Sequence, residues 1–316
     1  MLTLCNPIHL TINDQHGMRS ERAAPEDKMP LNDARYILTA TGPSAQGQVA
    51  VITAFINNLE GYVEEFNQFD DVEEESFFAR ACFRIKAAAN PGCAELIEAF
   101  TKTATRFFME WSITDADHRP RVLIFGSRLD HCVRDILYRW RSGELNMEVM
   151  GLVSNHENLA PIAAEHGIPY FFLPVTDASR SQQEARLMEI VCETESELLI
   201  LARYMQVLSD SLCEQLLGRA INIHHSFLPG FKGARPYHQA YKRGVKVIGA
   251  TAHYITTDLD EGPIIDQVVE RVDHSLTPVK LESLGRNCEC VALHRAVKLH
   301  IERRVFLNGM RTVIFV

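Results

Sequence analysis

Short apolar runs alternate with stretches of helical periodicity along most of this chain. In the first third, residues 35–40 form an apolar run that stops before Gly42-Pro43. The pattern that follows predicts a helix at 47–58, strands at 62–69 and 76–85, a helix at 93–107 and a strand at 108–113. The order strand-helix-strand-strand-helix-strand is that of a ferredoxin-like split α+β unit.

After a polar linker at 115–120, strands and helices alternate regularly. The predicted strands lie at 121–125, 147–154, 170–173, 198–202 and 220–223, and the predicted helices at 130–139, 158–166, 182–195 and 208–217. Such alternation predicts an open, mostly parallel, Rossmann-like α/β sheet that binds ligands beyond the carboxyl ends of its strands. The chain should end with a helix at 281–305, a turn at Gly309 and a strand at 312–316.

The length of 316 residues exceeds one comfortable hydrophobic core, so we expect two domains. The predicted division is a polar leader at 1–33, a first domain at 34–114, the linker, and a second domain at 121–316. Translation could also begin at Met18 or Met29, which would shorten the leader.

Charge and composition narrow the class of protein. The net charge of −9 argues against a general nucleic-acid binder, which needs a basic surface. No apolar run reaches about 18 residues, so no membrane span is expected, and no signal peptide is evident at the N-terminus. Eight scattered cysteines without a CxxC spacing suit a reducing, cytoplasmic setting. Cys288 and Cys290 form the closest pair, which we interpret as free thiols on or near a helix.

The candidate chemistry lies in Asn222, His224 and Asp260. Asn222 and His224 are two positions apart, so on a strand their side chains leave the same face. Asp260 follows in a separate segment that ends in a Glu-Gly-Pro turn signal. An amide and an imidazole that bind a carbonyl oxygen, with an acid that handles the attacking group, suit acyl or formyl transfer.

Two alternatives compete at this site. Asp258 lies two residues before Asp260 and is a rival for the acidic role. His225, His238 and His253 raise the question of a metal, but no HExxH motif or paired Cys/His spacing is present. We therefore predict no metal ion.

The segment from Asn222 to Pro229, with Asp260 before its Gly-Pro turn, resembles the formyltransferase-hydrolase family that uses 10-formyltetrahydrofolate. It is most similar to the deformylases of that family, from about Arg121 to the C-terminus. A weaker likeness at 35–114 is to the amino-acid-sensing (ACT) domain that precedes the catalytic domain in those enzymes.

This resemblance implies hydrolysis of 10-formyltetrahydrofolate, which is a substrate and not a cofactor, to tetrahydrofolate and formate. It implies that Asn222 and His224 stabilise the oxyanion and that Asp260 handles the proton. It also implies a pterin site with His253 nearby, built from Met205, Gln206, Val207 and Leu208 on one side and from the 255–260 loop, with Thr257 and Leu259, on the other. The family setting is one-carbon and purine metabolism.

Departures from related patterns guide the remaining predictions. Ser44-Ala45 stands where the family places a charged pair, which predicts little response to an amino-acid effector. The 126–131 turn lacks the phosphate-cradling pattern of glycinamide ribonucleotide formyltransferases, and the Ser-Leu-Leu-Pro pattern of methionyl-tRNA formyltransferases is absent. A catalytically silent folate or amino-acid sensor is the competing class. An open sheet edge in the first domain predicts a homodimer or homotetramer.

Overall fold

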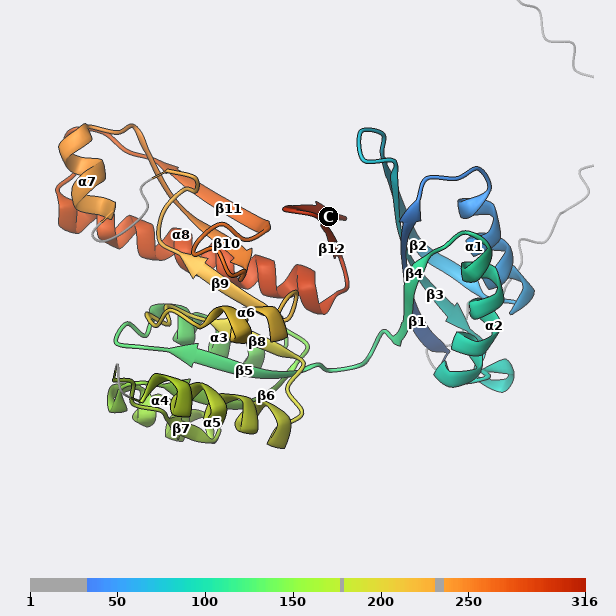
Figure 1. The fold of residues 1–316 in the computed structure, drawn as a ribbon, viewed down its shortest axis with the longest axis horizontal. Coiled ribbons are helices and arrows are strands. Elements are labelled where there is room, and N and C mark those ends of the chain that lie inside the picture. Colours follow the sequence, from blue (N-terminus) through green and yellow to red (C-terminus); the bar gives the residue numbers. More distant parts are fainter. Residues whose placement is uncertain (1–32, 177–178, 231–235) are drawn as a thin grey trace, which may run out of the picture.

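A computed structural model describes residues 33–176, 179–230 and 236–316. The predicted leader therefore lies outside the described residues, apart from its last position. The chain forms a smaller N-terminal unit and a larger α/β unit joined by a short connection after Asp115 (Figure 1). None of the described helices is both long enough and apolar enough to cross a lipid bilayer.

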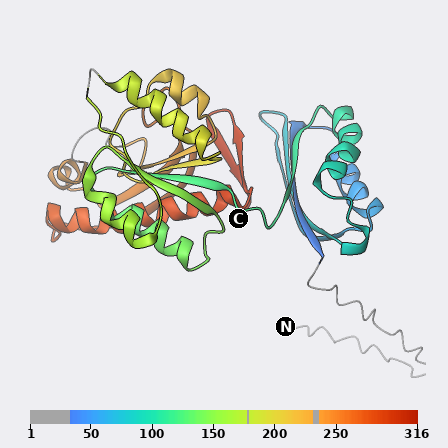
Figure 2. The ribbon, with the colours of Figure 1, turned by 90° about the horizontal axis from the view of Figure 1, so that it is seen from below.

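The N-terminal unit is an antiparallel four-stranded sheet in the order β2-β3-β1-β4. Its elements are β1 (Ala34–Pro43), α1 (Gln48–Asn58), β2 (Tyr62–Asp71), β3 (Ser76–Ile85), α2 (Cys93–Arg106) and β4 (Glu110–Asp115). Both helices cover the same face of the sheet (Figure 2). They pack through Ile52, Leu96 and Phe100, which are fully buried. The order of the elements and the antiparallel sheet fit an ACT-like fold.

The larger unit is built on a seven-stranded sheet in the order β11-β10-β9-β8-β5-β6-β7. Its strands are β5 (Arg121–Gly126), β6 (Glu148–Ser154), β7 (Tyr170–Phe172), β8 (Leu198–Leu201), β9 (Ala220–His224), β10 (Val247–Tyr254) and β11 (Ile264–Arg271). Its helices are α3 (His131–Arg141), α4 (Ala160–His166), α5 (Arg180–Glu193), α6 (Asp210–Gln215), α7 (Pro236–Arg243) and α8 (Pro278–Ile301).

Pairing within this sheet is parallel from β7 to β9 and antiparallel from β9 to β11. The four residues of β8 are all buried, as is typical of a parallel strand covered on both faces of its sheet. The mostly parallel α/β fold is therefore confirmed, and the predicted element boundaries differ from the observed ones by a few residues.

The predicted C-terminal helix at 281–305 is wrong at its end. The helix stops at Ile301, and Arg303 adopts a left-handed backbone with φ of 55°. Val305 begins β12 (Val305–Asn308), which pairs with β13 (Arg311–Ile314) in an antiparallel hairpin around Gly309. Apolar residues at the helix end and in the short strand fit either period, so the sequence pattern could not separate them.

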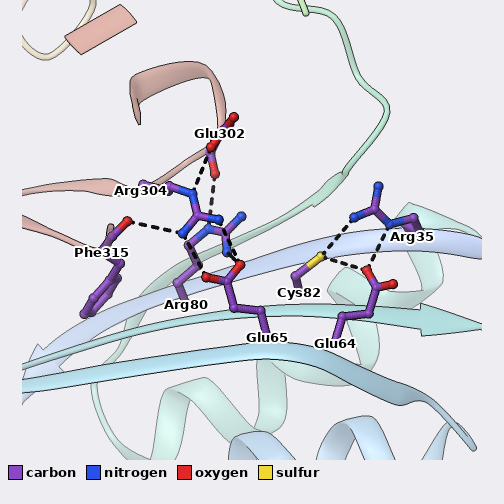
Figure 3. A network of polar contacts seen from close by, with 8 residues as sticks. All are labelled: Arg35, Glu64, Glu65, Arg80, Cys82, Glu302, Arg304 and Phe315. Carbon is purple, nitrogen blue, oxygen red and sulfur yellow. Dashed lines mark hydrogen bonds and ion pairs between the residues drawn. The ribbon is translucent and has the colours of Figure 1, made fainter. Parts of the chain in front are cut away.

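The C-terminal hairpin docks against the N-terminal unit through a polar network (Figure 3). Arg304 donates to both carboxylate oxygens of Glu65 on β2, at 2.8 and 2.9 Å. Arg80 on β3 donates to the same carboxylate at 2.8 Å and to the backbone oxygen of Glu302 at 3.1 Å. Phe306 packs edge-on against Phe78 beside this network, so the hairpin covers part of the sheet face that the helices leave open.

Replacing Arg304 by alanine should weaken this contact. The substitution removes the two-pronged bond to Glu65 but leaves Arg80 to neutralise the carboxylate, so we expect a loss of about 1–2 kcal/mol in unfolding free energy. Urea unfolding measures it, and Arg186→Ala, at an exposed ion pair on α5, is the matched control. Equal stability of the two variants would show that the network contributes little.

Candidate active site

Strand β9 presents Asn222 and His224 at its carboxyl end. Along β10, Asn222 lies opposite His253, and His224 lies opposite Thr251. The side chains of Asn222 and His253 meet, with the amide nitrogen 3.3 Å from the imidazole Nε2. Both Asn222 and His224 line the same cavity, as the spacing of two predicts for residues on one face of a strand.

Asp260 reaches this pair from the loop between β10 and β11. Its backbone is left-handed with φ of 59°. The following turn requires glycine, because a Cβ on Gly262 would lie 1.8 Å from the backbone oxygen of Tyr254. The Asp260 carboxylate lies 3.0 Å from His224 Nδ1 and 3.9 Å from His253 Nε2.

Asp258 also lines the cavity, but its side chain is exposed. Among the described residues, no ion pair joins Asp258 to His224 or to His253, the two histidines that Asp260 contacts. Of the two acids, the structure thus places Asp260 in contact with the imidazole that the sequence pattern singled out.

Electrostatics keep Asp260 ionised. Burial raises the pKa of its carboxyl group, but the hydrogen bond from His224 and the nearby His224 and His253 rings outweigh burial, so the pKa lies below its usual 3.8. An aspartate can transfer protons at neutral pH if its pKa is raised or if a histidine assists it. The contact between Asp260 and His224 favours the second of these. His224 Nε2 is buried and has no hydrogen-bond partner in the described part of the chain. That nitrogen is available to a substrate.

The cavity around these residues has a volume of about 790 Å³. All the residues predicted to hold the pterin line it: Met205, Gln206, Val207, Leu208, His253, Thr257 and Leu259. Met205 is 60% exposed and therefore not a core residue, whereas Leu208 also packs against the apolar cluster under β8. The cavity is large enough for a bicyclic ring with a substituent.

The metal alternative finds no support at the three histidines considered for it. Instead, the one group of described His, Cys, Asp or Glu side chains with ligand atoms close enough to share an ion is His131, Cys132 and Glu289. A hydrogen bond to Cys290 and burial raise the pKa of the Cys132 thiol well above its usual range, so it stays protonated. Protonated thiols are poor metal ligands.

His225 differs from its expected orientation. A residue next to His224 on a regular strand would face the opposite side, but β9 ends at His224 and the two rings lie 5.1 Å apart. Both line the cavity. Burial, followed by Arg203 and His224, lowers the pKa of His225 to about 4, so it is neutral at physiological pH.

A buried cluster of polar side chains beside the cavity was not predicted from the sequence. Its members Arg203 and Tyr237 line the cavity. Glu289 on α8 is 1% exposed and accepts hydrogen bonds from His131 at 2.8 Å and from Tyr237 at 2.9 Å. Arg203, which follows β8, lies 3.3 Å from the same carboxylate. A position just beyond a buried parallel strand was the one available signal for Arg203, and a single glutamate within a long helix gives no sign of burial.

Acid should destabilise this site. The folded-state pKa of His225 is about 4 against an ordinary 6.5, so the unfolded chain binds more protons between these values and stability falls as the pH drops through them. At pH 5 this one histidine accounts for about 2 kcal/mol. Burial lowers the pKa of His253 as well, with the same sign.

Urea unfolding midpoints between pH 8 and pH 5 measure this loss. His225→Gln should flatten the pH dependence, while His274→Gln, at an exposed position, should leave it unchanged. Equal slopes for the unaltered protein and His225→Gln would contradict the assignment.

This chain is similar to known proteins over most of its length. Residues 120–297 match the family model described as formyl transferase. A curated relative from Corynebacterium, formyltetrahydrofolate deformylase, is 44% identical over 89% of this chain and 98% of its own length. The solved structure of formyltetrahydrofolate deformylase from Burkholderia mallei is 53% identical, with a TM-score of 0.86 over 90% of this chain and all of that one.

More distant solved structures cover a smaller share of this chain. A glycinamide ribonucleotide transformylase from Symbiobacterium toebii is 28% identical, with a TM-score of 0.59, and covers 63% of this chain and 95% of its own. The fold and the matching model define a member of the formyl transferase family. Within that family, the chain belongs to the formyltetrahydrofolate deformylases.

Proposed function

We propose that this protein hydrolyses 10-formyltetrahydrofolate to tetrahydrofolate and formate, with Asn222, His224 and Asp260 as its catalytic residues. The observation that supports these roles is their convergence in one cavity. Asp260 holds His224 through Nδ1, which leaves the buried Nε2 without a partner, and Asn222 lies on the same strand face.

The reaction follows from this arrangement. Asp260 accepts a proton from a water molecule as the water oxygen attacks the formyl carbon. The negative charge that develops on the formyl oxygen is stabilised by the amide of Asn222 and by an Nε2 proton of His224. Collapse breaks the bond between carbon and N10 of the folate, and N10 takes the proton from Asp260. The formic acid that remains loses its own proton to solvent and becomes formate.

We propose that water is the acceptor of the formyl group, because the side chains of the 126–131 turn are poorly suited to bind the phosphate of a ribonucleotide. Ser127 Oγ donates to Asn155 at 2.7 Å and accepts from the backbone of Met205 at 3.1 Å. The His131 ring is bonded to the buried Glu289. The side chains of Ser127 and His131, which could otherwise contact a ribonucleotide phosphate, are therefore already bonded within the protein.

Formate release and formylated ribonucleotide, measured side by side with glycinamide ribonucleotide present, test this choice. We expect formate alone. Ribonucleotide formylation at a rate that matches hydrolysis would make the protein a transferase.

For the N-terminal unit we propose an assembly role in a cytoplasmic homodimer or homotetramer, with weak or no response to glycine or methionine. The ACT-like sheet has free edges at β2 and β4 among the described strands, and Ser44-Ala45 carries no charge. The solution mass of the full chain, and the rate with each amino acid at millimolar concentration, test the two parts. A monomer would refute the first, and a several-fold rate change the second.

A further inference from the structure

Arg203 places a buried positive charge at the wall of the catalytic cavity. Its side chain is 10% exposed, and neither Nε nor Nη1 has a hydrogen-bond partner in the described part of the chain. The contact of Nε with Glu289, at 3.3 Å, is an ion pair without hydrogen-bond geometry. A buried guanidinium with unused donors is costly unless something else accepts from them.

The backbone and the surroundings of Arg203 hold it in this position. Its φ of 65° lies in the left-handed region, which costs about 1–2 kcal/mol for a residue with a side chain. Glu289 fixes the guanidinium from behind and is itself held by His131 and Tyr237. Burial raises the pKa of Glu289, but its bonds to His131 and the charge of Arg203 bring it below 4.5, so the carboxylate stays ionised.

The charges around the cavity leave one place for an anion. Arg203 is the sole arginine or lysine among the described residues that line it, and Asp258, Asp260 and Glu282 are acidic. The His225 ring lies 5.1 Å from that of His224, and the charge of Arg203 helps to lower the pKa of His225. Arg203 therefore lines the same cavity in which the reaction would produce an anion.

We propose that Arg203 is a binding site for a small carboxylate, and that its ligand is the formate released by hydrolysis. The inference rests on the proposed function, because that reaction is what places formate in this cavity. A planar guanidinium matches a carboxylate through two parallel hydrogen bonds. Transfer of formate to Arg203 would move the product away from the negative Asp260. Since Glu289 already neutralises Arg203, the affinity should be weak, with a Kd on the order of a millimolar.

Titration of the full-length protein with carbon-13 formate, without folate and at constant ionic strength, measures this binding by the shift and width of the formate signal. Arg203→Met alone would leave Glu289 buried and unpaired and could unfold the chain. The double variant Arg203→Met/Glu289→Gln removes both charges and keeps the shape, and Arg186→Met on the exposed face of α5 is the control. Binding should weaken at least 10-fold in the double variant and stay unchanged in the control.

The glutamate tail of the folate is a second source of carboxylate that Arg203 could bind. Comparing the folate substrate with one that lacks the tail distinguishes binding of the tail from binding of formate. If Arg203 holds the tail, the double variant loses the preference for the tailed substrate and still binds formate, which would overturn the proposal. No saturable binding of formate to the unaltered protein would overturn it as well. Formate release from 10-formyltetrahydrofolate is a separate readout, so a protein that turns over without binding formate refutes this inference alone. One that binds formate but does not turn over refutes the proposed function.

Discussion

Replacing Asp260 by asparagine should lower kcat by roughly 100-fold or more while the folate still binds. Asparagine keeps the volume of the side chain and an oxygen for His224 Nδ1, but it cannot take a proton from water. It also removes the negative charge that lies 3.0 Å from His224 Nδ1. Because the pKa of Asp260 lies below 3.8, the carboxylate is ionised at neutral pH.

Asp258→Asn is the matched control for that experiment. Asp258 is exposed in the same loop, so its variant tests loop charge without touching His224. We expect near-normal turnover in Asp258→Asn. If instead Asp258→Asn were impaired and Asp260→Asn turned over normally, the acidic role would belong to Asp258.

Replacing Asn222 by alanine should lower kcat by about 100- to 1,000-fold, equivalent to about 2.7–4 kcal/mol of transition-state stabilisation. The amide donates to the oxygen that becomes charged during attack, and it makes this bond at full strength only in the transition state. KM should therefore change much less than kcat.

The pH profile adds a second test of Asn222. An amide does not titrate, so Asn222→Ala should lower the rate by a similar factor across the pH range, without moving the limbs of the profile. Asn58→Ala, at an exposed position on α1, is the control for handling and stability. A large rise in KM with kcat unchanged would make Asn222 a binding residue rather than an oxyanion donor.

Local sequence patterns predicted much of the fold, because the hydrophobic periodicity and the turn-forming residues indicate the same element boundaries along the chain. Strand β3 was predicted at its observed bounds, because an acidic turn precedes this apolar run and an Asn-Pro-Gly turn follows it. The helix end at Ile301 was not, because it depends on Arg303 turning into the left-handed region and on Arg304 pairing with Glu65, which lies 239 residues away. Contacts between segments that are far apart in the sequence produce no periodic pattern in it, so they cannot be predicted from periodicity.

The residues of the candidate site also fall into those that the sequence predicts and those that only the folded structure brings together. Asn222 and His224 share a strand, so their common face follows from spacing alone. Asp260 joined them through the family pattern. Arg203 and Glu289 come from a loop and a helix that only the folded sheet brings together, so neither could be assigned from the sequence.

Water should supply the second oxygen of formate, and hydrolysis in oxygen-18 water tests this most directly. Purified full-length protein is mixed with 10-formyltetrahydrofolate in labelled water, without an amine acceptor, and the formate is analysed by mass. We expect formate and tetrahydrofolate in equal amounts, with one labelled oxygen in each formate. Absence of formate, or formate without the label, would contradict attack by water at the formyl carbon.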